Sequence, residues 1–218
     1  MNTDGFTIRS INDNEINKAA DLLSAAYYDD IFFKWCVDND KDRLKIVADY
    51  YKVYLNSRGC IAHVAESHKK GIIGVSVWLP HDTDEDMYKE IELVAGANAL
   101  QFRAVAEKSH KNEPSNGPFY QLVGFGVLKE EQGKGFGQAL IKHYLDILDE
   151  AGIPTYLEAS TPYYGGGVYG KFGYKPFGEL MYFSDTAVLY PLYREANQAL
   201  NAKRSIIGWG KHEWLNLF

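Results

Sequence analysis

The sequence lacks the features that mark several large classes of protein. It has two cysteines in 218 residues, and Cys36 and Cys60 form neither a metal-ligand spacing nor a disulfide framework. No apolar run is long enough to span a membrane, and the polar residues 1–4 do not resemble a signal peptide. We therefore expect a protein that uses neither a metal nor a membrane, in a reducing, cytoplasmic setting.

A clustered basic surface is missing as well. The chain has 23 lysines and arginines against 29 aspartates and glutamates, which gives a formal net charge of −6. Proteins whose main partner is a nucleic acid usually concentrate positive charge on one face, so this balance argues against such a partner. An acidic chain is weakly compatible with a cationic partner such as an amine.

Hydrophobic periodicity predicts one domain over residues 1–218, in an α+β or α/β three-layer arrangement. A helical insert is expected at about 84–109, with a break at Gly96, and an extra C-terminal tail at about 195–218. Strands are expected at residues 7–10, 60–66, 72–79, 119–128, 155–161, 174–183 and 187–194. Further helices are expected at residues 14–28, 31–37, 42–55, 139–150 and 168–172.

The most informative segment is a glycine-rich turn between the strand at 119–128 and the helix at 139–150. Gly133, Gly135 and Gly137 alternate there, and the nearest charge belongs to Lys134. A helix start normally carries Ser, Thr, Asp or Asn as its cap, and each glycine inside a helix costs roughly 1 kcal/mol relative to alanine. An anion on the exposed backbone amides would compensate, so the segment predicts a phosphate site. A flexible glycine-rich loop is the alternative.

Two further glycines, Gly124 and Gly126, interrupt the preceding strand. Glycine weakens a strand interior and commonly marks a bulge or the close approach of another backbone or a ligand. Either an extended ligand lies along this strand or a helix packs closely on it, and the residues alone leave both interpretations open.

Other phosphate-binding and hydrolytic motifs fail. Lys134 is followed by Gly135 rather than by the Ser or Thr of a P-loop. Residues 165–170 match the dinucleotide pattern, but Gly173 and Pro176 truncate any helix there, so that match is weak. The chain has no Gly-x-Ser-x-Gly motif, and its six histidines show no paired ligand spacing.

Two motifs lie in register on either side of a predicted helix and strand. The first is Gln132-Gly133-Lys134-Gly135-Phe136-Gly137, and the second is Tyr169-Gly170-Lys171-Phe172-Gly173-Tyr174. Because of these two motifs, residues 119–177 resemble the GNAT superfamily of acyl-CoA N-acyltransferases. Within that superfamily the chain looks most similar to puromycin N-acetyltransferase-like small-molecule acetyltransferases, through the helical insert after Pro80 and through residues 157–162.

The resemblance implies a mixed, mostly antiparallel central sheet with helices on both faces, splayed between its fourth and fifth strands. It implies acetyl-CoA as cosubstrate and no metal. The loop after Pro162 departs from the family pattern, because it lacks the asparagine that many relatives carry there. The implied cofactor-binding residues are Phe125, Gly126, Val127, Gln132, Gly133, Lys134, Gly135, Phe136, Gly137 and Gln138.

The same resemblance implies roles for three groups near the reacting atoms. The N–H of Val127 would polarise the thioester oxygen. Tyr169 would protonate the departing sulfur, although an aromatic packed under the turn is the alternative. Glu158 interrupts an apolar strand, so it is either the general base or the partner of a nearby cation.

The expected function is acetyl transfer from acetyl-CoA to a primary amine of a small molecule. A protein or peptide N-acetyltransferase and a non-catalytic CoA-binding sensor module are the alternatives, and a nucleotide-binding protein that uses residues 165–170 is a third. The acceptor, the acyl chain length and the oligomeric state stay open, with a homodimer as one option.

Overall fold

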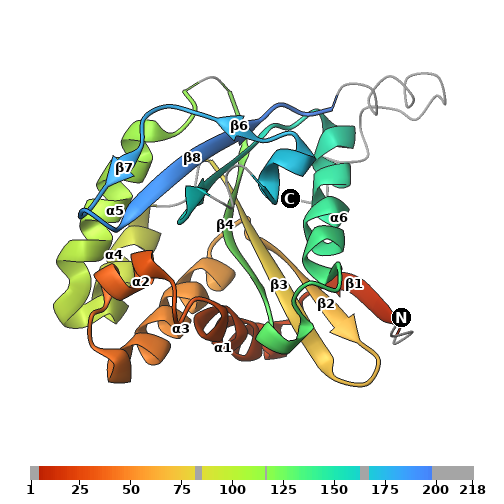
Figure 1. Ribbon diagram of the computed structural model, residues 1–218, viewed down its shortest axis with the longest axis horizontal. Coiled ribbons are helices and arrows are strands. Elements are labelled where there is room, and N and C mark those ends of the chain that lie inside the picture. Colours follow the sequence, from red (N-terminus) through yellow and green to blue (C-terminus); the bar gives the residue numbers. More distant parts are fainter. Residues whose placement is uncertain (1–4, 82–84, 116, 163–166, 198–218) are drawn as a thin grey trace.

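A central sheet organises the protein, whose computed structural model describes residues 5–81, 85–115, 117–162 and 167–197 (Figure 1). Its strands are β1 (Phe6–Ser10), β2 (Ile61–Ser67), β3 (Gly71–Pro80), β4 (Tyr120–Val127), β5 (Thr155–Ala159), β6 (Lys175–Pro176), β7 (Met181–Tyr182) and β8 (Val188–Arg194). They follow the order β1-β2-β3-β4-β5-β8-β6, and β7 pairs with β8. All described pairs are antiparallel except β4 with β5. The predicted mixed, mostly antiparallel sheet is confirmed.

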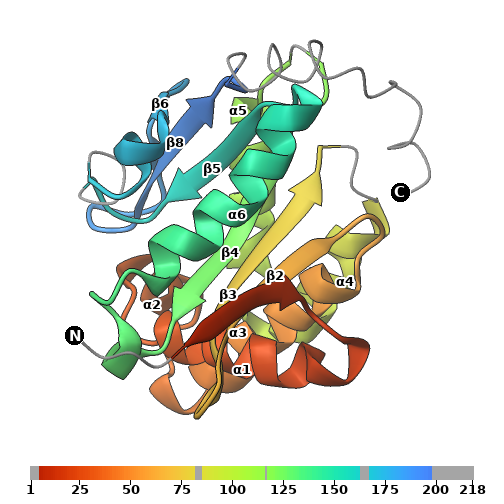
Figure 2. The same ribbon diagram turned by 90° about the vertical axis from the view of Figure 1, so that its right-hand side faces the viewer.

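Helices cover both faces of this sheet. The helices are α1 (Ile16–Ala26), α2 (Ile31–Cys36), α3 (Asp40–Asn56), α4 (Glu85–Ala95), α5 (Ala99–Asn112) and α6 (Phe136–Ala151). Short 3-10 turns lie at Asp13–Glu15, Gly96–Asn98, Lys129–Glu131 and Tyr169–Phe172. Figure 2 shows α6 lying across one face, with α1 to α5 gathered on the other.

The helix starts differ in how their first N–H groups are satisfied. The Asp30 carboxylate accepts hydrogen bonds from the first turn of α2, at 2.9 and 3.2 Å, and the Asn39 side chain accepts one from Lys41 N in α3 at 3.0 Å. Such caps stabilise a helix by about 1 kcal/mol each. Helix α6 has Gly135 as its N-cap residue and therefore has no side-chain cap. Its apolar face packs against the sheet through Leu140, Ile141, Tyr144, Leu145 and Leu148.

The parallel strands β4 and β5 stay together over only three pairs. They are in register from Tyr120 with Thr155 to Leu122 with Leu157, and the pairing ends there. At the same point the register of β4 against β3 shifts by one residue, which leaves Val123 as a bulge. A bulge bends and twists its strand. The rest of β4 therefore turns away from β5, and the predicted splay between the fourth and fifth strands is confirmed.

Two predicted segments compare differently with the structure. The break expected at Gly96 is confirmed, since Gly96 has a φ of +55° between α4 and α5. The single strand predicted at 174–183 is wrong. Gly178, with a φ of +62°, lies between β6 and β7, and each of these short strands pairs separately with β8.

The chain beyond residue 197 lies outside the described residues, and with it nearly all of the tail predicted at about 195–218. Among the helices that are described, none has both the length and the apolar character needed to cross a membrane.

Candidate active site

The glycine-rich turn has a backbone that suits glycine. Gly133 and Gly135 have φ values of +75° and +91°, a region that costs other residues about 1–2 kcal/mol. A Cβ added at either position would meet no atom within 4 Å, so the turn is open on that side. The first turn of α6 contains no acidic residue. Uncapped N–H groups at a helix start fit an anion such as a phosphate.

Charged side chains flank the same turn. The Glu131 carboxylate accepts a hydrogen bond from Lys134 Nζ at 3.0 Å and another from Lys70 Nζ. The two ammonium groups lower the pKa of Glu131. Lys70 comes from the turn between β2 and β3 and was not predicted. Two lysines beside one carboxylate leave one net positive charge near the uncapped amides.

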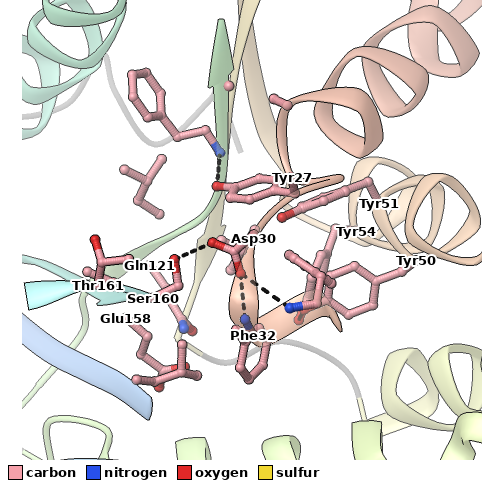
Figure 3. A pocket seen from close by; sticks show the side chains of 18 of the residues that line it. Tyr27, Asp30, Phe32, Tyr50, Tyr51, Tyr54, Gln121, Glu158, Ser160 and Thr161 are labelled. Atoms are coloured by element: carbon pink, nitrogen blue, oxygen red, sulfur yellow. Dashed lines mark hydrogen bonds between the residues drawn. The ribbon is translucent and has the colours of Figure 1, made fainter. Parts of the chain in front are cut away.

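The backbone of β4 points alternate N–H groups into the splay. Leu128 N donates to a carbonyl of β3 at 2.9 Å, whereas Phe125 N donates to the Tyr27 hydroxyl at 3.2 Å (Figure 3). Because direction alternates along a strand, the Val127 N–H points the same way as that of Phe125, and the Gly126 N–H points to β3. Val127 therefore offers its N–H to the gap between β4 and β5.

Helix packing accounts for the two glycines inside β4. A Cβ on Gly124 would lie 2.8 Å from the Tyr51 ring, and one on Gly126 would lie 2.9 Å from Ala26 Cβ. Both positions let α1 and α3 sit close against the sheet. Gly137 similarly brings the start of α6 against β4, where its Cβ would lie 2.9 Å from an aromatic ring. The close approach is therefore made by helices, the second of the two interpretations left open above.

One cavity of about 800 Å³ runs from the glycine turn to the helices on the opposite face of the sheet. Its first end is formed by the turn and the start of α6, and its middle by β4 and the end of β5. Its far end lies among α3, α4 and α5. A volume of this size holds a cofactor arm or a small ligand. All the predicted site residues line it except Lys134, whose neighbours Gly133 and Gly135 both do.

Glu158 lies in this cavity, held by two hydroxyl groups. Its Oε2 accepts a hydrogen bond from Ser109 Oγ of α5 at 2.8 Å, and its Oε1 accepts one from the Tyr156 hydroxyl at 2.9 Å. Burial raises the pKa of Glu158 to about 7, against the opposite effect of the two hydrogen bonds. A carboxyl group that titrates near neutral pH suits proton transfer.

The cation partner considered for Glu158 is absent from the described residues. Neither Glu158 nor the nearby Glu113 has a lysine or arginine within ion-pair distance there, and His110 lies 3.5 Å from Glu113. Burial also raises the pKa of Glu113. The far end of the cavity thus contains two carboxyl groups that no described lysine or arginine balances.

Aromatic side chains form the wall opposite Glu158 (Figure 3). The rings of Tyr27 and Tyr51 stack with their centroids 5.7 Å apart, and the Tyr50 hydroxyl donates to that of Tyr54 at 2.8 Å. Tyr88 of α4 lies near both carboxyl groups, and burial together with their charges raises its pKa to about 12. Aromatic faces beside carboxylates favour a bound organic cation.

A hydrogen bond joins two residues of the cavity wall, Asp30 and Ser160. The second carboxylate oxygen of Asp30 accepts a hydrogen bond from Ser160 Oγ at 2.5 Å, while the first caps α2 (Figure 3). Asp30 therefore joins the loop between α1 and α2 to the end of β5. No local pattern predicts this contact, because Asp30 and Ser160 lie 130 positions apart along the chain.

Tyr169 lies in the 3-10 turn after β5 and is 8% exposed. Its ring meets that of Tyr174 edge to face at 5.9 Å, and it also lines the cavity. The turn is anchored from β8, because Arg194 Nε donates to Phe172 O at 2.6 Å. The same guanidinium forms a buried bidentate pair with Asp149 of α6.

Comparison with protein families decides the family of this chain. Residues 28–174 match the model of the acetyltransferase (GNAT) family, which is more than half of the chain. The chain belongs to the GNAT family. It is an acetyltransferase, and members of this family use acetyl-CoA as cosubstrate.

Individual relatives agree with this assignment. An uncharacterised N-acetyltransferase of Schizosaccharomyces pombe is 26% identical over 182 residues, which cover 73% of this chain and 70% of that protein. A Corynebacterium glutamicum structure, described as histone acetyltransferase HPA2 and related acetyltransferase, superposes with a TM-score of 0.64 at 18% identity and covers 88% and 97% of the two chains. Arylalkylamine N-acetyltransferase 2 of Aedes aegypti superposes with a TM-score of 0.60 at 14% identity, over 88% and 100%. The structural likeness shows a shared fold.

Sequence reasoning missed three residues that shape this GNAT site. Ser109 holds Glu158, Lys70 joins the glycine turn, and Tyr27 binds a β4 amide. Each is separated by more than 45 positions from its partner, and no local pattern signals such a contact.

Some expectations lie outside what the structure describes. The loop at 163–166, and with it the first two residues of the dinucleotide-like stretch 165–170, is not among the described residues. Residues 169 and 170 of this stretch belong to the four-residue 3-10 turn Tyr169–Phe172. Among the described residues, no group of three or more His, Cys, Asp or Glu side chains could hold a metal ion. The narrower likeness to puromycin N-acetyltransferases stays a prediction.

Proposed function

We propose that the protein transfers the acetyl group of acetyl-CoA to a primary amine of a small molecule by direct attack in a ternary complex. The observation that carries this proposal is one cavity that joins the uncapped start of α6 to Glu158 and a tyrosine-rich wall. A diphosphate at one end and an amine at the other would occupy the same cavity. Much of the rate would then come from their mutual orientation.

The donor end binds through the backbone. The N–H groups of the turn and of the first turn of α6, from Gln132 to Gln138, would hold the diphosphate, and the lysine pair at Glu131 would add positive charge. Phe125, Gly126 and Val127 would line the arm that carries the thioester. The Val127 N–H, which points into the splay, would donate to the thioester oxygen as negative charge develops there.

The acceptor end supplies the proton transfers. The amine nitrogen would attack the thioester carbon, and the carbon–sulfur bond would break. Glu158 would accept the proton lost by the amine, directly or through water, and Tyr169 would donate a proton to the departing sulfur. Both residues line the cavity, from β5 and from the turn that follows it.

The lining of the acceptor end favours a small amine over a protein substrate. Helices α3, α4 and α5 enclose it with Tyr50, Tyr54, Tyr88 and Phe102. Tyrosine faces and unbalanced carboxyl groups suit a cation with an apolar body. The mosquito neighbour acts, by its name, on arylalkylamines, a class that meets this description.

A thiol-release assay tests the proposal. Purified protein is incubated with acetyl-CoA and a panel of amines: phenethylamine, tyramine, agmatine, spermidine and N-terminal peptides. We expect release of free thiol with at least one small amine, and weaker or no release with the peptides. Turnover confined to peptides would instead identify a protein acetyltransferase.

The Tyr169→Phe variant separates catalysis from binding. We expect kcat to fall by about 10²-fold or more, because the sulfur loses its proton donor, while the Kd for acetyl-CoA in calorimetry stays within twofold of the wild-type value. Acetyl-CoA binding without turnover of any acceptor would mark a non-catalytic CoA-binding module. Unchanged activity in the variant would remove Tyr169 from the chemistry.

A further inference from the structure

Ser109 is a buried polar residue of the helical insert, and its hydroxyl is committed to Glu158. Ser109 is 8% exposed, and its Oγ lies 2.8 Å from Glu158 Oε2. Ser109 belongs to α5, whereas Glu158 belongs to β5, 49 positions further along the chain. The Tyr156 hydroxyl holds the other carboxylate oxygen at 2.9 Å. Each oxygen of the carboxyl group therefore has one hydroxyl donor.

We propose that Ser109 is a positioning residue that keeps the Glu158 carboxylate aimed into the acceptor cavity, where it can take a proton from the acceptor amine. This inference rests on the proposed function, since it takes Glu158 as the general base. A carboxylate has about four acceptor sites. The two donors use one on each oxygen, and the remaining lone pairs are left for the proton of an acceptor amine.

Opposing interactions determine the ionisation of Glu158. Burial and the charge of Glu113 favour its neutral form, and hydrogen bonds from Ser109 and Tyr156 favour its ionised form. The other titratable groups that face it are the tyrosines of α3 and α4, namely Tyr50, Tyr54 and Tyr88. The charge of Glu113 in turn interacts with His81 and His110. No lysine or arginine described in the structure offsets the buried charge, so the hydroxyl donors carry that task.

Helix α5 of the helical insert would therefore have a role in the chemistry as well as in lining the cavity. Helix α5 delivers Ser109 from the face opposite α6, so docking of α5 and the ionisation of Glu158 depend on each other. If α5 moved away, Glu158 would lose both the Ser109 donor, which favours its ionised form, and its burial, which favours the neutral form, so the direction and the pKa of the carboxyl group would both change. Ser109 would then link the shape of the acceptor end to the chemistry.

The pH dependence of catalysis tests this role. In Ser109→Ala, we expect the acidic limb of the kcat/KM profile to move upward by about one pH unit, because the ionised form loses a donor. Activity should fall about tenfold on the acidic side of the limb and approach the wild-type value above pH 9. Ser109→Thr keeps the hydroxyl and should restore the wild-type limb. A role limited to packing would lower activity equally at every pH, which would overturn the inference.

A titration without turnover makes the test independent of the proposed function. The Glu158 carboxyl carbon, labelled with ¹³C, is followed by NMR in the wild type, in Ser109→Ala and in Tyr156→Phe, which removes the second donor. We expect both substitutions to raise the titration midpoint. Identical midpoints in all three proteins would overturn the inference even if the enzyme is active.

The matched control is Glu107→Gln, an exposed residue on the same helix, which should change neither the limb nor the midpoint. If the wild type acetylates no amine in the panel, the proposed function fails. The NMR midpoints would still show whether Ser109 sets the ionisation of Glu158, so the two failures are distinguishable.

Discussion

Replacing Glu158 with glutamine should weaken catalysis and strengthen the fold in the same protein. The side chain keeps its shape, and the hydroxyl groups of Ser109 and Tyr156 can each still form a hydrogen bond with the amide. The substitution removes only the ability to ionise. Catalysis and stability therefore respond to one change for one reason, the cost of ionising a half-buried carboxyl group.

The magnitude follows from the pKa of Glu158. Burial raises it from an ordinary value of 4.5 to about 7. Below pH 4.5 the carboxyl group is protonated in the folded and unfolded states alike, so its titration costs nothing. Between pH 4.5 and 7 the folded state holds the proton that the unfolded state has lost, so stability falls as the pH rises. Above pH 7 the full difference of about 3 kcal/mol applies.

The stability of Glu158→Gln should therefore depend on pH in a defined way. At pH 8.5 we expect the variant to be more stable than the wild type by up to about 3 kcal/mol, or a Tm higher by about 6–12 °C for a chain of this size. At pH 4.5 the two proteins should unfold alike. Urea unfolding at both pH values gives the difference directly. A difference that does not change with pH would refute the burial argument.

Activity should move in the opposite direction. We expect kcat/KM to fall by about 10²–10⁴-fold, the usual contribution of a general base, and the limb near pH 7 to disappear. A limb that remains should follow the pKa of the acceptor amine. The Glu107→Gln control on α5 should match the wild type in rate and in stability. Near-normal rates with the limb intact would show that Glu158 is not the base.

Two further predictions concern the glycine turn and the buried ion pair. Gly135 and Gly152 lie at opposite ends of α6, with φ values of +91° and +73°. Replacing either glycine with alanine should therefore lower the stability by about 1–2 kcal/mol. Only Gly135→Ala places a methyl group at the cavity. Calorimetry should show acetyl-CoA binding weakened at least tenfold in Gly135→Ala and unchanged in Gly152→Ala; equal affinities would count against the phosphate site. Asp149→Ala leaves the Arg194 guanidinium buried without its partner, and urea unfolding should show a loss of about 3–5 kcal/mol. A loss below 1 kcal/mol would mean that water reaches the arginine.

Short-range patterns carried much of the fold prediction. The helices around Leu23 and Leu145, and the break at Gly96, follow from spacing and from glycine, which act within a few residues. The prediction of one strand at 174–183 was wrong because the local pattern does not show how the two halves of this segment pair. Gly178 turns the chain in the left-handed region, and only the pairing with β8 shows that the two halves belong to separate strands.

Some features of the site could likewise be predicted from the sequence, and others could not. The glycine turn was predictable because a helix start without a cap is a local anomaly, and Glu158 because a carboxyl group in an apolar strand needs a reason. The role of Gly124 could not be predicted, because a glycine in a strand gives the same sequence pattern whether a ligand or the Tyr51 ring packs on it. The raised pKa of Glu158 depends on burial, which the chain acquires only when α5 docks.

By itself, then, the sequence determined most of the helices and strands, the family motifs and the place of the glycine-rich turn, since all of these depend on neighbours along the chain. Only the tertiary structure decided what surrounds each group. It brought Ser109 to Glu158, Lys70 to Glu131 and Tyr27 to the β4 backbone. Those contacts set charge, burial and direction, and these are properties of neighbours in space.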